Sequence, residues 1–121
     1  MKGTFWGGFA LVSVSLWIGA ACGAQETPGA AGTRAHSLYN QHCVSCHGAS
    51  GTGSWRSWLF LIRPGNLTDA KKINALSDQY IFDLIKQGGA NIGKPGMPAF
   101  GFHLSDDEIR DLIAYVRTLP H

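Results

Sequence analysis

Two cysteines and a histidine lie close together near the middle of the chain. Cys43 and Cys46 are three residues apart, and His47 follows directly. Residues three and four apart share one face of a helix, so the two thiols and the imidazole can point toward one object. Thiols at this spacing can form thioether bonds to the vinyl groups of a haem, while the adjacent imidazole binds the iron. The segment Cys43–His47, here called the haem motif, therefore predicts one covalently attached haem c.

Two other interpretations of these residues remain open. An exported Cys-x-x-Cys pair can be a redox dithiol, but such a site needs the strand–helix context of a larger α/β fold. Two cysteines can also form half of a zinc site, which needs four ligands and usually a second matched pair. The third cysteine, Cys22, lies in the N-terminal segment. A redox-dithiol or metal-binding module without haem is therefore the weaker alternative.

Met97 is the candidate for the second axial ligand of the iron. If a signal containing Met1 is removed, Met97 is the one remaining methionine. It lies between Gly96 and Pro98, and such residues can fix a loop that holds the sulfur at the iron. His103, six residues further on, is its competitor. If Met97 does not bind, the iron has an open site, and the protein is a haem enzyme or gas sensor.

The N-terminus has the pattern of a secretory signal. Lys2 precedes an apolar run over residues 5–21, and small residues surround Cys22. Cleavage before Cys22 would produce a lipoprotein, cleavage after Ala24 would release a soluble protein, and a retained segment is barely long enough to span a membrane. We expect residues 1–24 to be a signal or membrane anchor, 25–33 a flexible linker and 34–121 the folded domain.

The rest of the chain predicts an all-α fold. Helices are expected over 34–47, 77–87 and 105–119, with a short helical turn within 67–76 and irregular backbone over 49–68. Ser77 is a plausible N-cap, and Ser105 with Glu108 forms a capping box. The net charge is only +2, and no long basic run suggests nucleic-acid binding.

Several short segments together resemble a known family. The first are Ala35 and Tyr39, followed by the haem motif with Gly48. The later ones are the segments Pro64–Thr68, Gly96–Phe100 and Leu112–Arg117. In this order the chain resembles a class I cytochrome c of the bacterial single-haem type. The resemblance implies three to four helices wrapped around one covalently bound haem, and an electron carrier rather than an enzyme, with no small-molecule substrate.

The resemblance also implies roles for single residues. The first and last helices should cross near Ala35, Tyr39 and Tyr115. The carbonyl of Pro64 is the candidate acceptor for the Nδ1–H of His47.

Trp55, Arg63 and Asn66 are candidates to contact the haem propionates. The apolar stretch 55–62 that contains Trp55 is either core or a docking patch for a membrane partner. Expected partners are redox proteins, including subunits of a membrane respiratory or photosynthetic complex. The expected location is periplasmic, tethered to the membrane through lipidated Cys22 or an N-terminal anchor.

Overall fold

The computed structural model describes residues 28–119, and every regular element in that range is helical. The helices are α1 (Pro28–His42), α2 (Val44–His47), α3 (Trp55–Leu59), α4 (Ala70–Ala75), α5 (Asp78–Gln87) and α6 (Asp106–Val116), with a short 3-10 helix, η1 (Ala90–Ile92), after α5. The described range contains no strand, so the predicted all-α class is confirmed.

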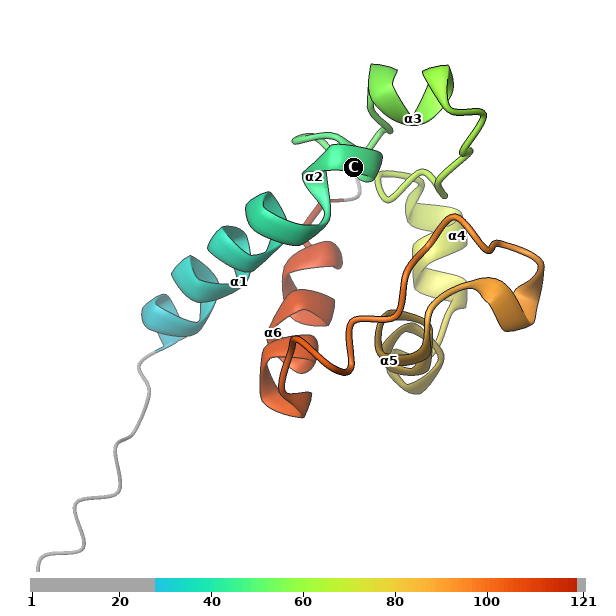
Figure 1. The fold of residues 1–121 in the computed structure, drawn as a ribbon. Helices are drawn as coiled ribbons and strands as arrows, with labels where there is room; N and C mark the ends of the chain where they lie inside the picture. The colour runs from blue at the N-terminus through green and yellow to red at the C-terminus, as the bar shows by residue number, and fades with distance from the viewer. Residues whose placement is uncertain (1–27, 120–121) are drawn as a thin grey trace, which may run out of the picture.

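The first and last helices, α1 and α6, pack against each other (Figure 1). Tyr39 is fully buried, and its ring centroid lies 5.2 Å from that of Tyr115. Ala35, one turn before Tyr39 on the same face of α1, is also buried. The predicted crossing at these three residues is confirmed.

Helix α6 contributes more buried apolar side chains than any other helix, four of the nine in the described range. Its four buried side chains recur at helical spacing, and they are Ile109, Leu112, Ile113 and Val116. The capping box that was predicted at its start is present, because Ser105 N donates to Glu108 Oε2 at 2.8 Å and Glu108 N donates to Ser105 Oγ at 3.3 Å. Local sequence signals therefore both start this helix and orient it.

Helix α5 begins as predicted at the Ser77 cap, whose Oγ accepts from Tyr80 N at 3.1 Å. It packs on α6 through Ile81, the one buried residue of the helix. The apolar residues of this helix recur at helical spacing, and they are Tyr80, Ile81, Leu84 and Ile85. Tyr80 is 40% exposed, so this apolar stripe only partly faces the protein core.

Helix α1 starts earlier than the sequence indicated. Residues 28–33, expected to be linker, form its first turns. Proline is favoured at the first helical position, and Arg34 Nε donates to Asp111 Oδ2 at 2.9 Å, which ties this part of α1 to α6. The expected signal or anchor over 1–24 and linker residues 25–27 lie outside the described residues.

Helix α3 lies in the stretch that was expected to be irregular. Ser54 caps it, because its Oγ accepts from Ser57 N at 3.2 Å. Of the helices between residues 28 and 119, α3 contacts α2 alone. No helix in that range has both the length and the apolar character needed to cross a membrane.

Candidate haem-binding site

The haem motif lies at the junction of α1 and α2. The predicted helix 34–47 is divided at Cys43, but the helical hydrogen bonds continue, with Cys43 N donating to Tyr39 O and His47 N to Cys43 O, both at 2.8 Å. Cys43 and His47 are therefore one turn apart. Both Cys43 and Cys46 are free, half-buried thiols.

The imidazole of His47 is oriented by a backbone carbonyl. Its Nδ1 lies 3.3 Å from the oxygen of Gly65, whereas the expected acceptor was the carbonyl of the preceding residue, Pro64. Only one of two successive carbonyls faces the ring, because neighbouring carbonyls of a non-helical backbone point in different directions. A carbonyl at Nδ1 leaves Nε2 as the nitrogen available to a metal.

The protonation states at the motif favour metal binding by His47 and disfavour thiol redox chemistry. Burial lowers the pKa of His47, although the Gly65 carbonyl opposes this, so the neutral metal-binding form is favoured. Burial, assisted by the charge of Cys46, raises the pKa of Cys43 to about 11. Reactive dithiols instead have lowered pKa values.

The donor set fits a haem better than a zinc ion. No cluster of three or more His, Cys, Asp or Glu residues within 28–119 could hold a metal ion. Two free thiols beside one oriented imidazole are the groups that a covalently bound haem requires. This chemistry argues against both interpretations without haem.

The backbone of α2 is held in place by the loop that follows it. Gly53 N donates to His47 O at 2.7 Å, and Ser54 N donates to Cys46 O at 3.0 Å. From the other side, the buried hydroxyl of Tyr39 donates to Gly48 O at 2.8 Å. Tyr39 was expected at the helix crossing, but its hydrogen bond to the motif was not expected. Gly53 and Ser54 were missed because they act on backbone atoms of the motif. Gly48, already noted in the sequence, adopts a φ of +75°.

Met97 lies in a loop that packs against the end of α5. Gly89 N donates to Met97 O at 2.9 Å, and Met97 N donates to Lys94 O at 3.1 Å. A Cβ added at Gly88 would lie 2.9 Å from Met97 O, which shows how closely the two segments approach. The side chain of Met97 is half-buried. The backbone that carries the sulfur is therefore fixed by glycine-mediated packing.

The remaining predicted site residues lie on the surface. Trp55 is 72% exposed, with the Arg56 guanidinium 5.6 Å from its ring centroid. Arg63 is exposed. Asn66 Oδ1 accepts from the backbone N and the Oγ1 of Thr68, at 2.9 and 2.8 Å, so its carbonyl stabilises a local turn.

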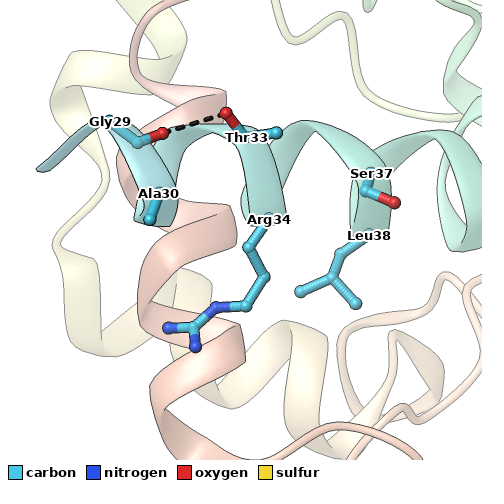
Figure 2. A pocket seen from close by; sticks show the side chains of 6 residues that line it. All are labelled: Gly29, Ala30, Thr33, Arg34, Ser37 and Leu38. Carbon is cyan, nitrogen blue, oxygen red and sulfur yellow. Dashed lines mark hydrogen bonds between the residues drawn. The ribbon is translucent and has the colours of Figure 1, made fainter. Parts of the chain in front are cut away.

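His103, the competing ligand, is also exposed. A pocket that includes no residue of the motif lies along α1 between Gly29 and Leu38. Figure 2 shows its lining, which consists of Gly29, Ala30, Thr33, Arg34, Ser37 and Leu38. It contains none of the predicted site residues, and it is therefore not part of the candidate haem site.

Comparisons with known proteins identify the family. The sequence model of the family described as cytochrome c oxidase, cbb3-type, subunit III matches residues 30–116. The structure is similar to the c-type cytochrome KustC0563, with a TM-score of 0.62 and 26% identity over 72% of this chain and 98% of that one. No curated relative matches the chain.

A second solved structure is cytochrome CL from the marine methylotrophic bacterium Methylophaga aminisulfidivorans. Its TM-score is 0.57, and the 26% identity extends over 76% of this chain but only 55% of that one. Both similar structures are c-type cytochromes, so the all-α fold is that of a class I cytochrome c built for one covalent haem. This chain therefore belongs to the cytochrome c family described by the cbb3-type oxidase subunit III, whose members transfer electrons through covalently bound haem c.

Proposed function

We propose that this protein carries single electrons between redox proteins outside the cytoplasm, with haem c attached to Cys43 and Cys46 and its iron bound by His47 and Met97. The observation that carries the proposal is the haem motif on one helical turn, with free thiols and with His47 Nδ1 3.3 Å from the Gly65 carbonyl. When bound, the haem supplies an iron that alternates between ferric and ferrous states.

Each residue has a distinct role in this proposal. Two thioether bonds keep the haem in a domain too small to enclose it fully. The Gly65 carbonyl orients His47 and raises the basicity of its ring. A thioether from Met97 favours reduced iron and raises the reduction potential. With His47 and Met97 both holding the iron, no open site would remain for a substrate, and the protein would act as a carrier rather than an enzyme.

The location and partners follow from the N-terminal segment and the family. A secretory signal places the domain in the periplasm, and lipidated Cys22 or a retained anchor would tether it to the membrane. The description of the matching family supports redox partners in a membrane respiratory complex, with a photosynthetic complex as the other setting. Mass spectrometry of the mature protein distinguishes a lipidated N-terminus from cleavage after Ala24 or a retained anchor.

Mass spectrometry of proteolytic peptides tests the cofactor assignment. We expect one haem on the peptide that contains Cys43 and Cys46, and none in the Cys43→Ser/Cys46→Ser double variant. A mature protein without covalent haem, purified with two free thiols, would end this proposal and favour the dithiol alternative.

Replacing Met97 tests the sixth ligand. In Met97→Ala, we expect loss of the weak sulfur-to-iron absorption band of the oxidised protein, a lower reduction potential and rapid binding of cyanide or carbon monoxide. The matched control is His103→Ala, which should leave spectrum and potential unchanged. If His103→Ala shows these changes and Met97→Ala does not, His103 is the ligand. A wild-type protein that is already high-spin and binds carbon monoxide rapidly would favour a haem enzyme or gas sensor.

A further inference from the structure

Helix α3 buries its small polar residue and exposes its large apolar ones. Ser57 is 4% exposed, and its Oγ donates to Ser54 O at 2.7 Å. The exposed side chains form what we call the α3 patch, and they are Trp55 (72%), Trp58 (76%), Leu59 (60%), Phe60 (71%) and Leu61 (86%). Contiguous exposed apolar surface of this kind marks an interaction site.

Leu61 strengthens the case that the patch has a function. Its φ is +56°, in the left-handed region that favours glycine, and it is the one non-glycine residue with positive φ in the described range. The turn is closed by Ile62 N, which donates to Ser57 O at 2.8 Å. An unfavourable backbone conformation that presents a large, exposed apolar side chain is an outlier of the type found at functional sites.

In the sequence on either side of the patch, the charged residues are of one sign. No Asp or Glu occurs between Glu26 and Asp69, while Arg56 lies within the apolar run and Arg63 follows it. Tryptophans with aliphatic side chains, bordered by arginines, match the interface of an anionic bilayer, where Trp lies at the headgroup level and Arg is attracted to lipid phosphate.

We propose that the α3 patch inserts into the surface of an anionic membrane. It would form a second membrane contact, additional to the N-terminal tether. The inference rests on the proposed function in one respect, because the tether keeps the domain beside the bilayer. A tethered domain needs little further affinity for a shallow apolar contact to form, since the effective concentration of lipid is high.

The position of α3 determines how the domain would lie. Helix α1 has 15 residues, so it is about 22 Å long. Its N-terminal end is the one nearest the tether, and α2 and α3 are at its other end (Figure 1). An α1 that lies along the membrane therefore allows contact at both places.

Lipid photocrosslinking tests the inference in the full-length holoprotein. The protein is reconstituted in phosphatidylcholine vesicles that contain a diazirine lipid, with or without phosphatidylglycerol, and crosslinked peptides are identified by mass spectrometry. We expect crosslinks in the N-terminal tether and in the peptide containing residues 55–61. The second set should increase with phosphatidylglycerol and decrease with added salt.

A double variant with a matched control completes the test. Trp58→Ser/Leu61→Gly should lose crosslinks at 55–61 and keep those in the tether, and glycine relieves the backbone strain at position 61, so folding is preserved. The control is Phe102→Ser, which removes an aromatic side chain that is 94% exposed outside the patch and should change nothing. An unchanged absorption spectrum confirms that the haem is bound in each variant.

Two results would overturn the inference. Crosslinks confined to the tether would show that the haem, a second copy or a protein partner covers the α3 patch. The N-terminal tether of the proposed function would remain supported in that case. Equal crosslinking of the double variant and the wild-type protein would show nonspecific labelling. Absence of crosslinks in the tether would instead contradict the tethered form of the proposed function.

Discussion

A single buried hydroxyl group connects helix packing to the haem motif. Tyr39 is fully buried between α1 and α6, and its hydroxyl donates to Gly48 O, directly after His47. In Tyr39→Phe, that carbonyl would lose a buried donor, which should lower the free energy of unfolding by about 1–2 kcal/mol. Chemical denaturation measures this loss. The control is Tyr115→Phe, whose hydroxyl makes no hydrogen bond within residues 28–119, and which should cost much less.

The same hydroxyl makes stability depend on alkaline pH. Burial raises the pKa of Tyr39 to about 12, whereas an unfolded tyrosine ionises near pH 10. The protonated form is therefore favoured in the fold, and its contribution is complete below about pH 10 and is lost as pH rises toward 12. The stability difference between wild type and Tyr39→Phe should shrink over that interval. A constant difference would contradict the assigned pKa.

At the scale of elements, the end of α5 and the Met97 loop act as one unit. Gly88 has a φ of +81°, and a Cβ there would meet Met97 O and Ala99 N at 2.9 Å. Gly88→Ala should therefore displace the loop, weaken the sulfur-to-iron absorption band and lower the reduction potential. Spectroscopic redox titration measures both changes.

Gly93 provides a control for an alanine at a positive φ that meets no neighbouring atom. Its φ is +74°, but nothing lies within 4 Å of an added Cβ. Both alanine variants carry the strain of a positive φ, which costs about 1 kcal/mol in the left-handed conformation of Gly93 (ψ 19°) and up to about 3 kcal/mol at Gly88, whose ψ of 177° lies in a region almost restricted to glycine. Only Gly88→Ala should change the spectrum and potential. Equal spectral changes in the two variants would refute the role assigned to close packing.

At the scale of the whole molecule, one arginine joins three helices. Arg117, at the end of α6, donates to Asp78 Oδ1 at 2.7 Å, to Ile73 O at 3.1 Å and to Leu76 O at 2.8 Å. It therefore connects α6 with the end of α4 and the start of α5.

Arg117→Ala should lower the free energy of unfolding by about 2 kcal/mol, because two backbone acceptors and a carboxylate lose a charged donor. Guanidinium denaturation followed by circular dichroism measures the change. Lys72→Ala, which removes an exposed ion pair with Asp69 at 3.2 Å, should change stability by about 0.5 kcal/mol or less. Similar losses of unfolding free energy in Arg117→Ala and Lys72→Ala would contradict the role of Arg117 in connecting the three helices.

The sequence predicted what local signals determine. The serine caps and helical spacing located α5 and α6, and the Cys43–His47 spacing indicated a shared helical turn. Gly65 as the acceptor for His47 was missed, because backbone approach between distant segments leaves no side-chain pattern. Helix α3 was missed because five residues are too few to show a period. The start of α1 was misplaced because the small residues after Pro28 resembled a linker, although proline is favoured at the first helical position.

The first turns of α1 have a geometric consequence for everything that precedes them. Residues 28–33 are helical, and Arg34 ties the helix to α6. The direction of the chain at Pro28 is therefore fixed relative to the haem motif at the other end of the helix. One residue inserted before Arg34 would turn that direction by about 100° and advance the chain by about 1.5 Å. Two whole turns, about seven residues, would restore the original heading. An insertion in a flexible linker would leave the orientation of the chain unspecified, whereas an insertion in this helix changes the direction of the chain at Pro28 by a defined angle.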